Sequence, residues 1–283
     1  MADARARLAG QALTLGSWLV AACVAALFGW LLADIVIHGA QKLSWDFLTS
    51  APERAGRRGG IWPILISTLW VLAVSLAAAL PLALGTAFWL HAFTPAGSRL
   101  SRAIRLLLDV LAGVPSIVFG LFGGVFFCVV LGLGFSLLAG GLTLACMILP
   151  LLIRTTEAGL AAVPADWSRG AAALGMTRTA ALRHILLPAA APAVIAGLML
   201  GIGRVLAETA VLIFTSGYVD RLPESLMDSG RVLAVHIYDL SMNVTGGDRA
   251  AYGTALVLIA LLLGVNGLAA SLTTRWLTRR LAA

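Results

Sequence analysis

The 283-residue chain has few charged residues, a single lysine and only three cysteines. Charged side chains make up 12% of the residues and apolar ones 60%. A soluble domain has about a quarter charged and about half apolar residues. The mean hydropathy is +0.97. This scarcity of charge excludes an ordinary soluble globular domain.

The lysine and the cysteines exclude several kinds of chemistry. A Walker A loop needs a lysine that follows glycine and precedes Ser or Thr, whereas Lys42 lies between Gln41 and Leu43. Each cysteine lies alone in an apolar run, which gives no disulfide framework and no Cys-x-x-Cys metal motif. We therefore expect no enzymatic, metal or cofactor site in this chain, and assign any ATP hydrolysis to another polypeptide.

Long apolar runs are abundant. Six of them are long enough for a helical membrane crossing, which takes about 20 residues: 13–37, 61–90, 104–131, 136–158, 189–217 and 253–274. Backbone polar groups in lipid need internal partners, so these runs predict an all-α polytopic membrane protein with about six transmembrane helices. The first run exceeds the 7–15 residues typical of a cleaved signal, so we expect it to be retained.

The domain division follows from these runs. Residues 1–60 hold the first helix and an external loop, 61–274 form a core of five helices, and 275–283 are a cytoplasmic tail. The core includes a cytoplasmic loop, 159–188, and an external loop, 218–252, in which a helix through Tyr238 is expected at the membrane surface.

We interpret the net charge of +7 as a signal for the orientation of the chain in the membrane, and not as a sign of nucleic-acid binding. With six spans both termini share one side, which carries twelve arginines near span ends against seven basic residues on the other side. The positive-inside rule then places both termini in the cytoplasm. Arg54, Arg57 and Arg58 form an external cluster that runs against this rule.

The 159–188 loop has signals for two short helices. Asp166 is a favourable N-cap, Gly175 can end the first helix in a left-handed conformation, Thr177 can cap the second, and Pro188 can begin the fifth span. A helix of about eight residues is marginal alone in water. We therefore expect a partner protein to hold this loop.

The same loop resembles the Glu-Ala-Ala coupling loop of ABC importer permeases. The matching residues are Ala171, Gly175, Ile185, Leu187 and Pro188, whereas Gly170 and Arg169 replace the first alanine and the glutamate. The resemblance implies that the loop docks into a cleft of an ATPase subunit. Either Asp166 substitutes for the missing acidic contact, or the cleft of the partner differs. The alternative is an alanine-rich loop with chance spacing.

The fifth run contains a charged pair. Gly197, Gly201, Arg204 and Glu208 fall within about 60° of arc on one helix face. Arg204 lies roughly 22 Å into the run, where an arginine costs at least ~2.5–3.5 kcal/mol, so it should face protein or a wet cavity. Either Glu208 neutralises Arg204 in a structural pair, or Arg204 binds an oxyanion bidentately. In the second case Glu208 orients the guanidinium or accepts the proton of hydrogen phosphate, which sulfate lacks.

Three segments resemble the permeases of phosphate importers: 201–210, 113–122 and 149–157. Ala207 and Val211 depart from the family pattern, where glycine and proline are usual. Arg154 is similar to a second arginine associated with transport, or else it is an anchor reaching the membrane interface. Ser116 either lines the path or belongs to a packing helix kinked at Pro115.

The resemblance covers nearly the whole chain and implies an ABC importer permease of type I fold, PstA type, in a bacterial inner membrane. It also implies a second homologous permease (PstC type), two cytoplasmic ATPase subunits that bind ATP and Mg, and an external phosphate-binding protein. The chain would import inorganic phosphate by alternating access. The alternatives are a permease for another oxyanion such as sulfate or phosphonate, a secondary transporter or channel without an ATPase, and a receptor or scaffold.

Overall fold

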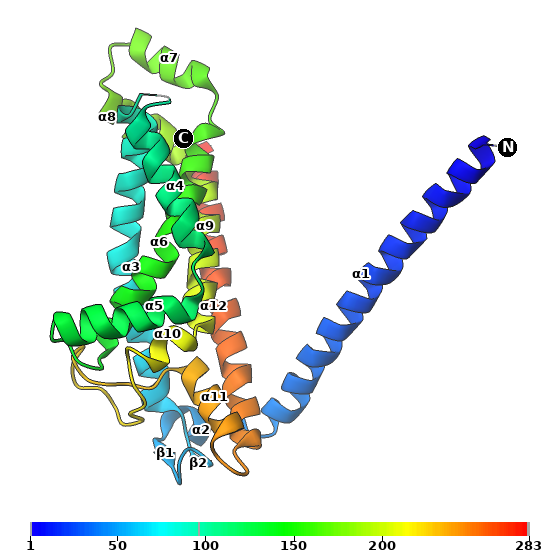
Figure 1. Ribbon diagram of the computed structural model, residues 1–283, viewed down its shortest axis with the longest axis vertical. Coiled ribbons are helices and arrows are strands. Elements are labelled where there is room, and N and C mark those ends of the chain that lie inside the picture. The colour runs from blue at the N-terminus through cyan, green and yellow to red at the C-terminus, as the bar shows by residue number, and fades with distance from the viewer. Residues whose placement is uncertain (1, 96, 282–283) are drawn as a thin grey trace.

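The computed structural model describes residues 2–95 and 97–281, with side chains described for 10, 11, 13–95 and 97–271. Four long helices form an upright bundle (Figure 1). They are α3 (Trp62–Phe88), α6 (Leu137–Ala161), α9 (Leu187–Ala207) and α12 (Asp248–Leu281). Their lengths and apolar character match the runs predicted as spans. The fold is therefore that of an all-α polytopic membrane protein.

Helix α6 is the centre of the core and packs directly against α3. The Ser75 hydroxyl on α3 donates to the Gly141 carbonyl on α6 over 3.0 Å, and both groups are buried. A Cβ at Gly141 would lie 2.5 Å from Val74 Cγ1, so only glycine permits this approach. Small residues bring helix backbones close where both helices are apolar, as here.

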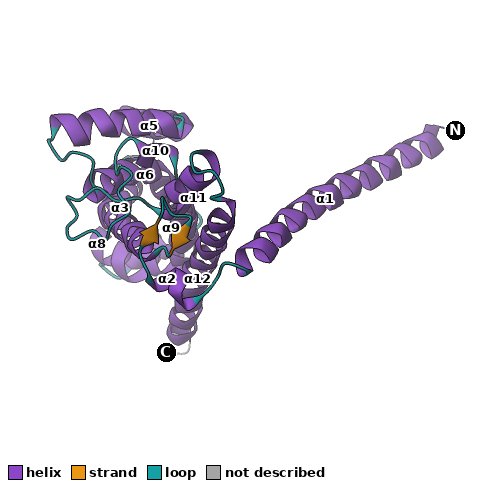
Figure 2. Cartoon of the chain, turned by 90° about the horizontal axis from the view of Figure 1, so that it is seen from below, coloured by secondary structure: helices purple, strands orange, loops and turns teal. Residues whose placement is uncertain are grey.

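Helix α1 (Ala2–Ala40) projects away from this bundle (Figures 1 and 2). Its apolar span Leu13–Ala40 has a hydropathy of 2.4, and its most apolar window is 0% buried within the chain. Contact with α12 is confined to its C-terminal end, where Tyr252 Oη donates to Asp34 Oδ2 over 2.8 Å. So much exposed apolar surface requires lipid or another chain to cover it.

The prediction of one span over 104–131 is wrong in geometry. Helix α4 (Arg99–Gly113) ends before Pro115, and the helical stretch Ser116–Val130, formed by α5 (Ser116–Gly123) and η2 (Gly124–Val130), continues at 100° to it. Val114 is extended (φ −70°, ψ 128°), because a residue before proline is disfavoured in the α conformation. In Figure 1 α5 lies across the bundle. Within the described residues five helices can cross a membrane by length and composition, or six if the bent pair is one span.

The fifth run also departs from a single helix over 189–217. Helix α9 ends at Ala207, and the four-residue α10 (Ala210–Ile213) follows after a break. Glu208 at that break is extended, with ψ 125°. Helix α11 (Leu233–Met242) includes Tyr238 as expected, but its Leu233, Val235 and Leu240 are buried and it packs against α12, so it is part of the protein core and not a helix on the membrane surface.

Short elements occupy the two ends of the bundle. At one end lie η1 (Trp89–Phe93), α7 (Ala165–Ala173), α8 (Arg178–Ala181) and η3 (Leu182–Leu186). At the other end lie α2 (Trp45–Thr49) and a small hairpin of β1 (Pro52–Glu53) and β2 (Arg58–Gly59) (Figure 1).

Candidate functional site

Arg204 lies on an exposed stripe of α9. The stripe recurs every three or four residues and consists of Pro192, Ala196, Leu200, Arg204 and Ala207. Within the described part of the chain, Arg204 makes no ion pair and no side-chain hydrogen bond. It is a cation in the last turn of an apolar helix, on a face that this chain leaves uncovered.

Glu208 does not share the helix face of Arg204, so the structural pair, one of the two alternatives that the sequence left open, is absent. The helix ends one residue earlier, and the Glu208 carboxylate instead accepts from the Val211 amide over 3.4 Å at the start of α10. A helix start favours negative charge because its first amides have no partner within the helix. Glu208 thus fixes the turn after Arg204 without neutralising it.

The glycines that the sequence singled out lie beside this stripe, on the side of α9 that faces α6. A Cβ at Gly197 would lie 2.0 Å from Thr155 Oγ1, and one at Gly201 would lie 3.4 Å from Leu152 Cδ2, both on α6. Gly197 therefore permits a close approach of the two helices, whereas a Cβ at Gly201 would make an ordinary contact. The partner helix belongs to the same chain, and this packing fixes the rotation of α9.

Ser116 is brought toward the same end of α9 by the packing of α5 on α10. A Cβ at Gly120 would lie 3.0 Å from Val211 Cα, and one at Gly124 would lie 2.9 Å from the Phe214 carbonyl oxygen. The residue numbers increase in the same direction on both segments, from Gly120 to Gly124 and from Val211 to Phe214. Ser116, the half-buried first residue of α5, lies one turn before Gly120.

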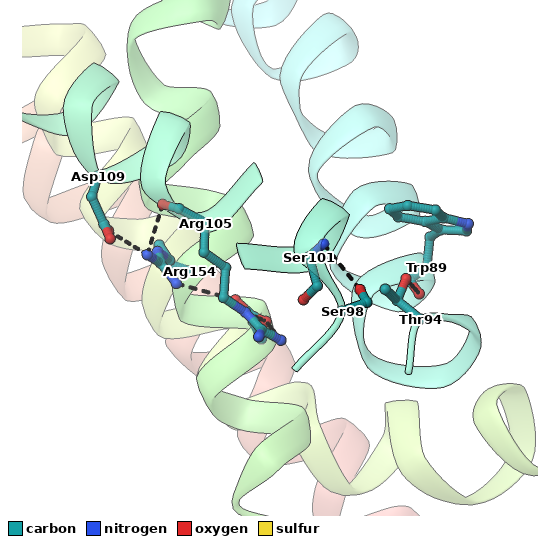
Figure 3. Close-up of polar contacts among 8 residues, drawn as sticks. Trp89, Thr94, Ser98, Ser101, Arg105, Asp109 and Arg154 are labelled. Atoms are coloured by element: carbon teal, nitrogen blue, oxygen red, sulfur yellow. Dashed lines mark hydrogen bonds and ion pairs between the residues drawn. The ribbon is translucent and has the colours of Figure 1, made fainter. Parts of the chain in front are cut away.

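Arg154 lies in an ion-pair network between α4 and α6, which neither interpretation of the sequence predicted (Figure 3). Its guanidinium pairs with Asp109 and donates to the Arg105 carbonyl over 3.0 Å. Arg154 also reaches Glu157 over 3.4 Å, and Arg105 pairs with the same carboxylate over 2.6 Å. Two arginines and two carboxylates neutralise one another across the two helices.

Asp109, Arg105 and Glu157 were not singled out from the sequence. A signal did exist, because Arg105 and Asp109 are four residues apart and so face the same way on a helix. Helix α4 buries only Ser101 and Leu108, so charge contributes much of its attachment to α6.

Two predictions for the 159–188 loop are confirmed. Gly175 has φ 72°, and the amides of Gly175 and Met176 donate to carbonyls of α7 over 3.0 Å each, which is a Schellman C-cap. Thr177 Oγ1 accepts from the Ala180 amide over 3.2 Å and caps α8.

Two other predictions for this loop are wrong. Pro164 is the N-cap of α7, and Asp166 lies in the first turn, where it pairs with Arg169 over 2.6 Å. Pro188 does not begin the fifth span, because one continuous helix runs over Arg178–Ala207. The π-helical η3 ends at Leu186, two residues before Pro188, and its wider turns accommodate the missing backbone donor.

The loop presents an exposed surface around α7. Trp167 is 50% exposed and Leu174 is 82% exposed, and a Cβ at Gly170 would meet open space. Ala171, by contrast, is buried. Ile185 is half-buried and packs against a small core formed by Leu160, Leu182, Leu186 and Ala190, and Leu187 is also half-buried. The loop is thus fixed on its inner side and open on its outer side.

The bundle has the fold of ABC importer permeases. A chain of a bacterial alginate ABC transporter, solved with a pentasaccharide-bound periplasmic protein, matches with a TM-score of 0.65 at 15% identity, over 91% of this chain and 94% of that one. A chain of the inward-facing MetNI methionine ABC transporter matches with a TM-score of 0.61 at 16% identity, over 76% of this chain and 96% of that one.

Sequence comparison gives the family. The model for the binding-protein-dependent transport system inner membrane component matches residues 79–283, and the chain belongs to this family. It is 30% identical to the probable ABC transporter permease protein YqgI of Bacillus subtilis over 274 residues, which cover 92% of this chain and 91% of that protein. It is 32% identical to the phosphate transport system permease protein PstA of Mycobacterium leprae over 245 residues, or 84% and 79% of the two chains. The predicted resemblance to PstA-type permeases is confirmed.

Proposed function

We propose that the chain is the PstA-type permease subunit of an ATP-driven importer of inorganic phosphate. The observation that carries this proposal is the exposed, unpaired position of Arg204 on an apolar helix. An arginine facing lipid costs at least ~2.5–3.5 kcal/mol, so the stripe that carries it should face a second protein across a wet path. A guanidinium in such a path attracts an oxyanion and can bind it through two parallel hydrogen bonds.

A second homologous permease, of the PstC type, covers this stripe in the proposed assembly. Helix α1 supports a multi-subunit arrangement, because its apolar surface is uncovered over a whole span. The translocation path then lies between the two permeases, with Arg204, Ser116 and the break at Glu208 on this chain's side. Arg154, which pairs with Asp109 and Glu157 between α4 and α6, holds the helices on this side of the proposed path in position.

Two ATPase subunits on the cytoplasmic side bind the 159–188 loop and hold the ATP and Mg that drive transport. The exposed Trp167 and Leu174 supply apolar contacts there, and the Asp166–Arg169 pair supplies charge of both signs. Both chain termini are cytoplasmic in this orientation, and the α2 and hairpin end faces the external binding protein. Movement of α7 driven by nucleotide binding would pass to α8 and η3, which α7 contacts, and from there to α9, because α8, η3 and α9 form one helix.

Substrate identity is tested by competition in proteoliposomes that contain the whole transporter. Labelled phosphate uptake should require ATP and the binding protein, and excess sulfate should leave it unchanged. The variant Glu208→Gln should weaken this rejection of sulfate, because the proton-accepting carboxylate is lost. Uptake of sulfate at the phosphate rate by the wild type would show that the substrate is another oxyanion. Phosphate uptake that persists without any ATPase would show a secondary transporter or channel instead.

A further inference from the structure

The hairpin formed by residues 51–60 lies at the end of the molecule opposite α7 (Figure 1). Strands β1 and β2 pair antiparallel, with Pro52 opposite Gly59 and Glu53 opposite Arg58. Figure 2, which views the molecule from this end, shows the strands in front of the bundle helices. The hairpin therefore projects from the bundle on the face that an external protein would meet.

The tip of this hairpin has an unusual backbone. Arg54, Ala55 and Gly56 follow one another in the left-handed region, with φ values of 50°, 58° and 84°. The left-handed conformation costs a residue with a side chain about 1–2 kcal/mol. Two such residues in succession persist only where the surroundings impose them, and strain of this kind is often found at functional sites.

Helix α11 and the turn after it impose the shape of the tip. A Cβ at Gly56 would lie 2.7 Å from His236 Cε1 and 3.1 Å from Leu240 Cδ2, so the tip lies directly on α11. Arg57 Nη1 donates to the Thr245 carbonyl over 3.3 Å. The hairpin is thus seated at two points and keeps one orientation.

Helix α11, on which the tip lies, is held in place by contacts of its own. His236 is fully buried, and Arg231 Nη1 lies 3.4 Å from its Nδ1. Arg231 also pairs with Asp239 over 2.9 Å and donates to the Tyr218 carbonyl over 3.0 Å. These contacts hold the 218–252 loop together beneath the hairpin.

The hairpin forms a basic patch on this face, next to a loop whose charged side chains are mostly acidic. Residues 51–60 hold three arginines and one glutamate, whereas residues 218–252 hold five acidic and three basic side chains. Arg54 and Arg58 are exposed, and within the described residues neither side chain has an ion pair or a hydrogen bond. Arginine in an external loop also runs against the positive-inside rule. Two free guanidinium groups are therefore displayed from a rigid support.

We propose that the hairpin tip is the docking point for an acidic surface of the external solute-binding protein. This inference rests on the proposed function, which makes this end of the molecule external. Arginine pairs bidentately with carboxylates and is enriched at the energetic centres of protein interfaces. A support that is already ordered lowers the entropy cost of association. The tip projects outward, whereas sites for small ions and molecules are concave, so a protein surface fits it better than free phosphate does.

The test uses the complete transporter in vesicles of neutral lipid, with the binding protein that stimulates the ATPase activity of the wild type. The variant R54E/R58E should raise the half-stimulating concentration of binding protein at least about tenfold, without changing the basal ATPase rate. R54Q/R58Q should give a smaller rise. Increasing the salt from about 50 mM to about 300 mM should weaken stimulation of the wild type far more than that of R54E/R58E.

The matched control is R221E/R249E, which makes the same charge change at two exposed arginines on the same face. It should shift the half-stimulating concentration less than about twofold. Equal shifts in both double variants would mean that the overall charge of this face, and not the hairpin tip, attracts the binding protein. No shift in R54E/R58E would mean that the tip makes no contact with the binding protein. Either result overturns the proposal. A shift seen only in vesicles with anionic lipid would assign the arginines to lipid headgroups and overturn it too. A wild type that is stimulated by its binding protein but carries no phosphate would refute the proposed substrate and leave the docking proposal standing.

Discussion

Arg154 on α6 pairs with Asp109 on α4, and its guanidinium also donates to the carbonyl of Arg105 (Figure 3). The contact joins the first half of the bent pair α4–α5 to the central helix of the bundle. Helix α5, beyond the bend, packs on α10 next to the end of α9. One ion-pair network therefore anchors the segment that reaches toward Arg204.

Removing the charge of Glu157 should destabilise this network more than removing that of Asp109. Glu157 is 12% exposed and faces both Arg105 and Arg154, whereas Asp109 is 62% exposed. Glu157→Gln leaves two arginines without their shared carboxylate and should cost about 1–3 kcal/mol, and Asp109→Asn less than about 1 kcal/mol. Thermal unfolding of the two purified variants in detergent measures the difference. Equal stability losses in the two variants would show that the burial of Glu157 does not increase its contribution to stability.

Close packing of α6 and α9 should fail if a methyl group is added at Gly197. The Cβ of Gly197→Ala would overlap Thr155 Oγ1, which lies 2.0 Å away. Overpacking of this kind costs about 1–3 kcal/mol, so the yield and the melting temperature should fall. Gly203→Ala is the control, because its Cβ meets nothing nearer than 3.6 Å. A Gly197→Ala protein as stable as the Gly203→Ala protein would contradict the predicted clash.

Acid should loosen the packing of α11 beneath the hairpin. Burial, helped by the nearby Arg231, lowers the pKa of His236 from 6.5 to about 3. Below pH 6.5 the unfolded chain binds a proton at this imidazole and the folded chain does not. The free energy of unfolding should therefore fall as the pH drops from about 6.5 toward 3, with a slope approaching 1.4 kcal/mol per pH unit. The stability of His236→Gln should depend less on pH over this window, as thermal unfolding at a series of pH values will show; parallel curves for both proteins would refute the assignment.

The outer face of α7 should be needed for coupling and not for folding. Leu174 is 82% exposed, so Leu174→Asp should leave the melting temperature of the isolated chain unchanged within the error. In the assembled transporter it should abolish ATP-dependent uptake, because a charge enters an apolar contact. Leu222→Asp is the matched control, because it makes the same change at a position that is 49% exposed in the external 218–252 loop. Normal uptake by Leu174→Asp would exclude this surface as the ATPase contact.

Much of the fold was predictable because membrane spans depend on local hydropathy and length. The bend at Pro115 was visible as a helix break, but its angle depends on how Gly120 packs against Val211, which no local pattern encodes. The end of α9 at Ala207 was missed because the run stays apolar through Phe214, and only the partner contacts of α10 decide that the chain turns there.

Some features of the candidate site were also predictable from the sequence, and others were not. Arg204 was predictable, because a charge in an apolar span is rare enough to notice. Its separation from Glu208 was not, since a spacing of four implies a pair only if the helix continues. Two partners of Arg154, Arg105 and Asp109, lie 49 and 45 residues away along the chain, and only the tertiary packing of α4 on α6 brings them to Arg154.

The most direct test of the central claim is phosphate uptake by the complete transporter carrying Arg204→Ala, Arg204→Lys or the neighbouring control Leu200→Ala. Both positions lie on the exposed stripe of α9, so assembly with the second permease is checked for each variant by co-purification. If Arg204 binds the oxyanion, uptake should fall at least about a hundredfold in Arg204→Ala and partly recover in Arg204→Lys, since lysine keeps the charge but loses the bidentate fork. Leu200→Ala should transport nearly as well as the wild type. Normal uptake by an assembled Arg204→Ala transporter would contradict the claim that this arginine forms part of a phosphate path.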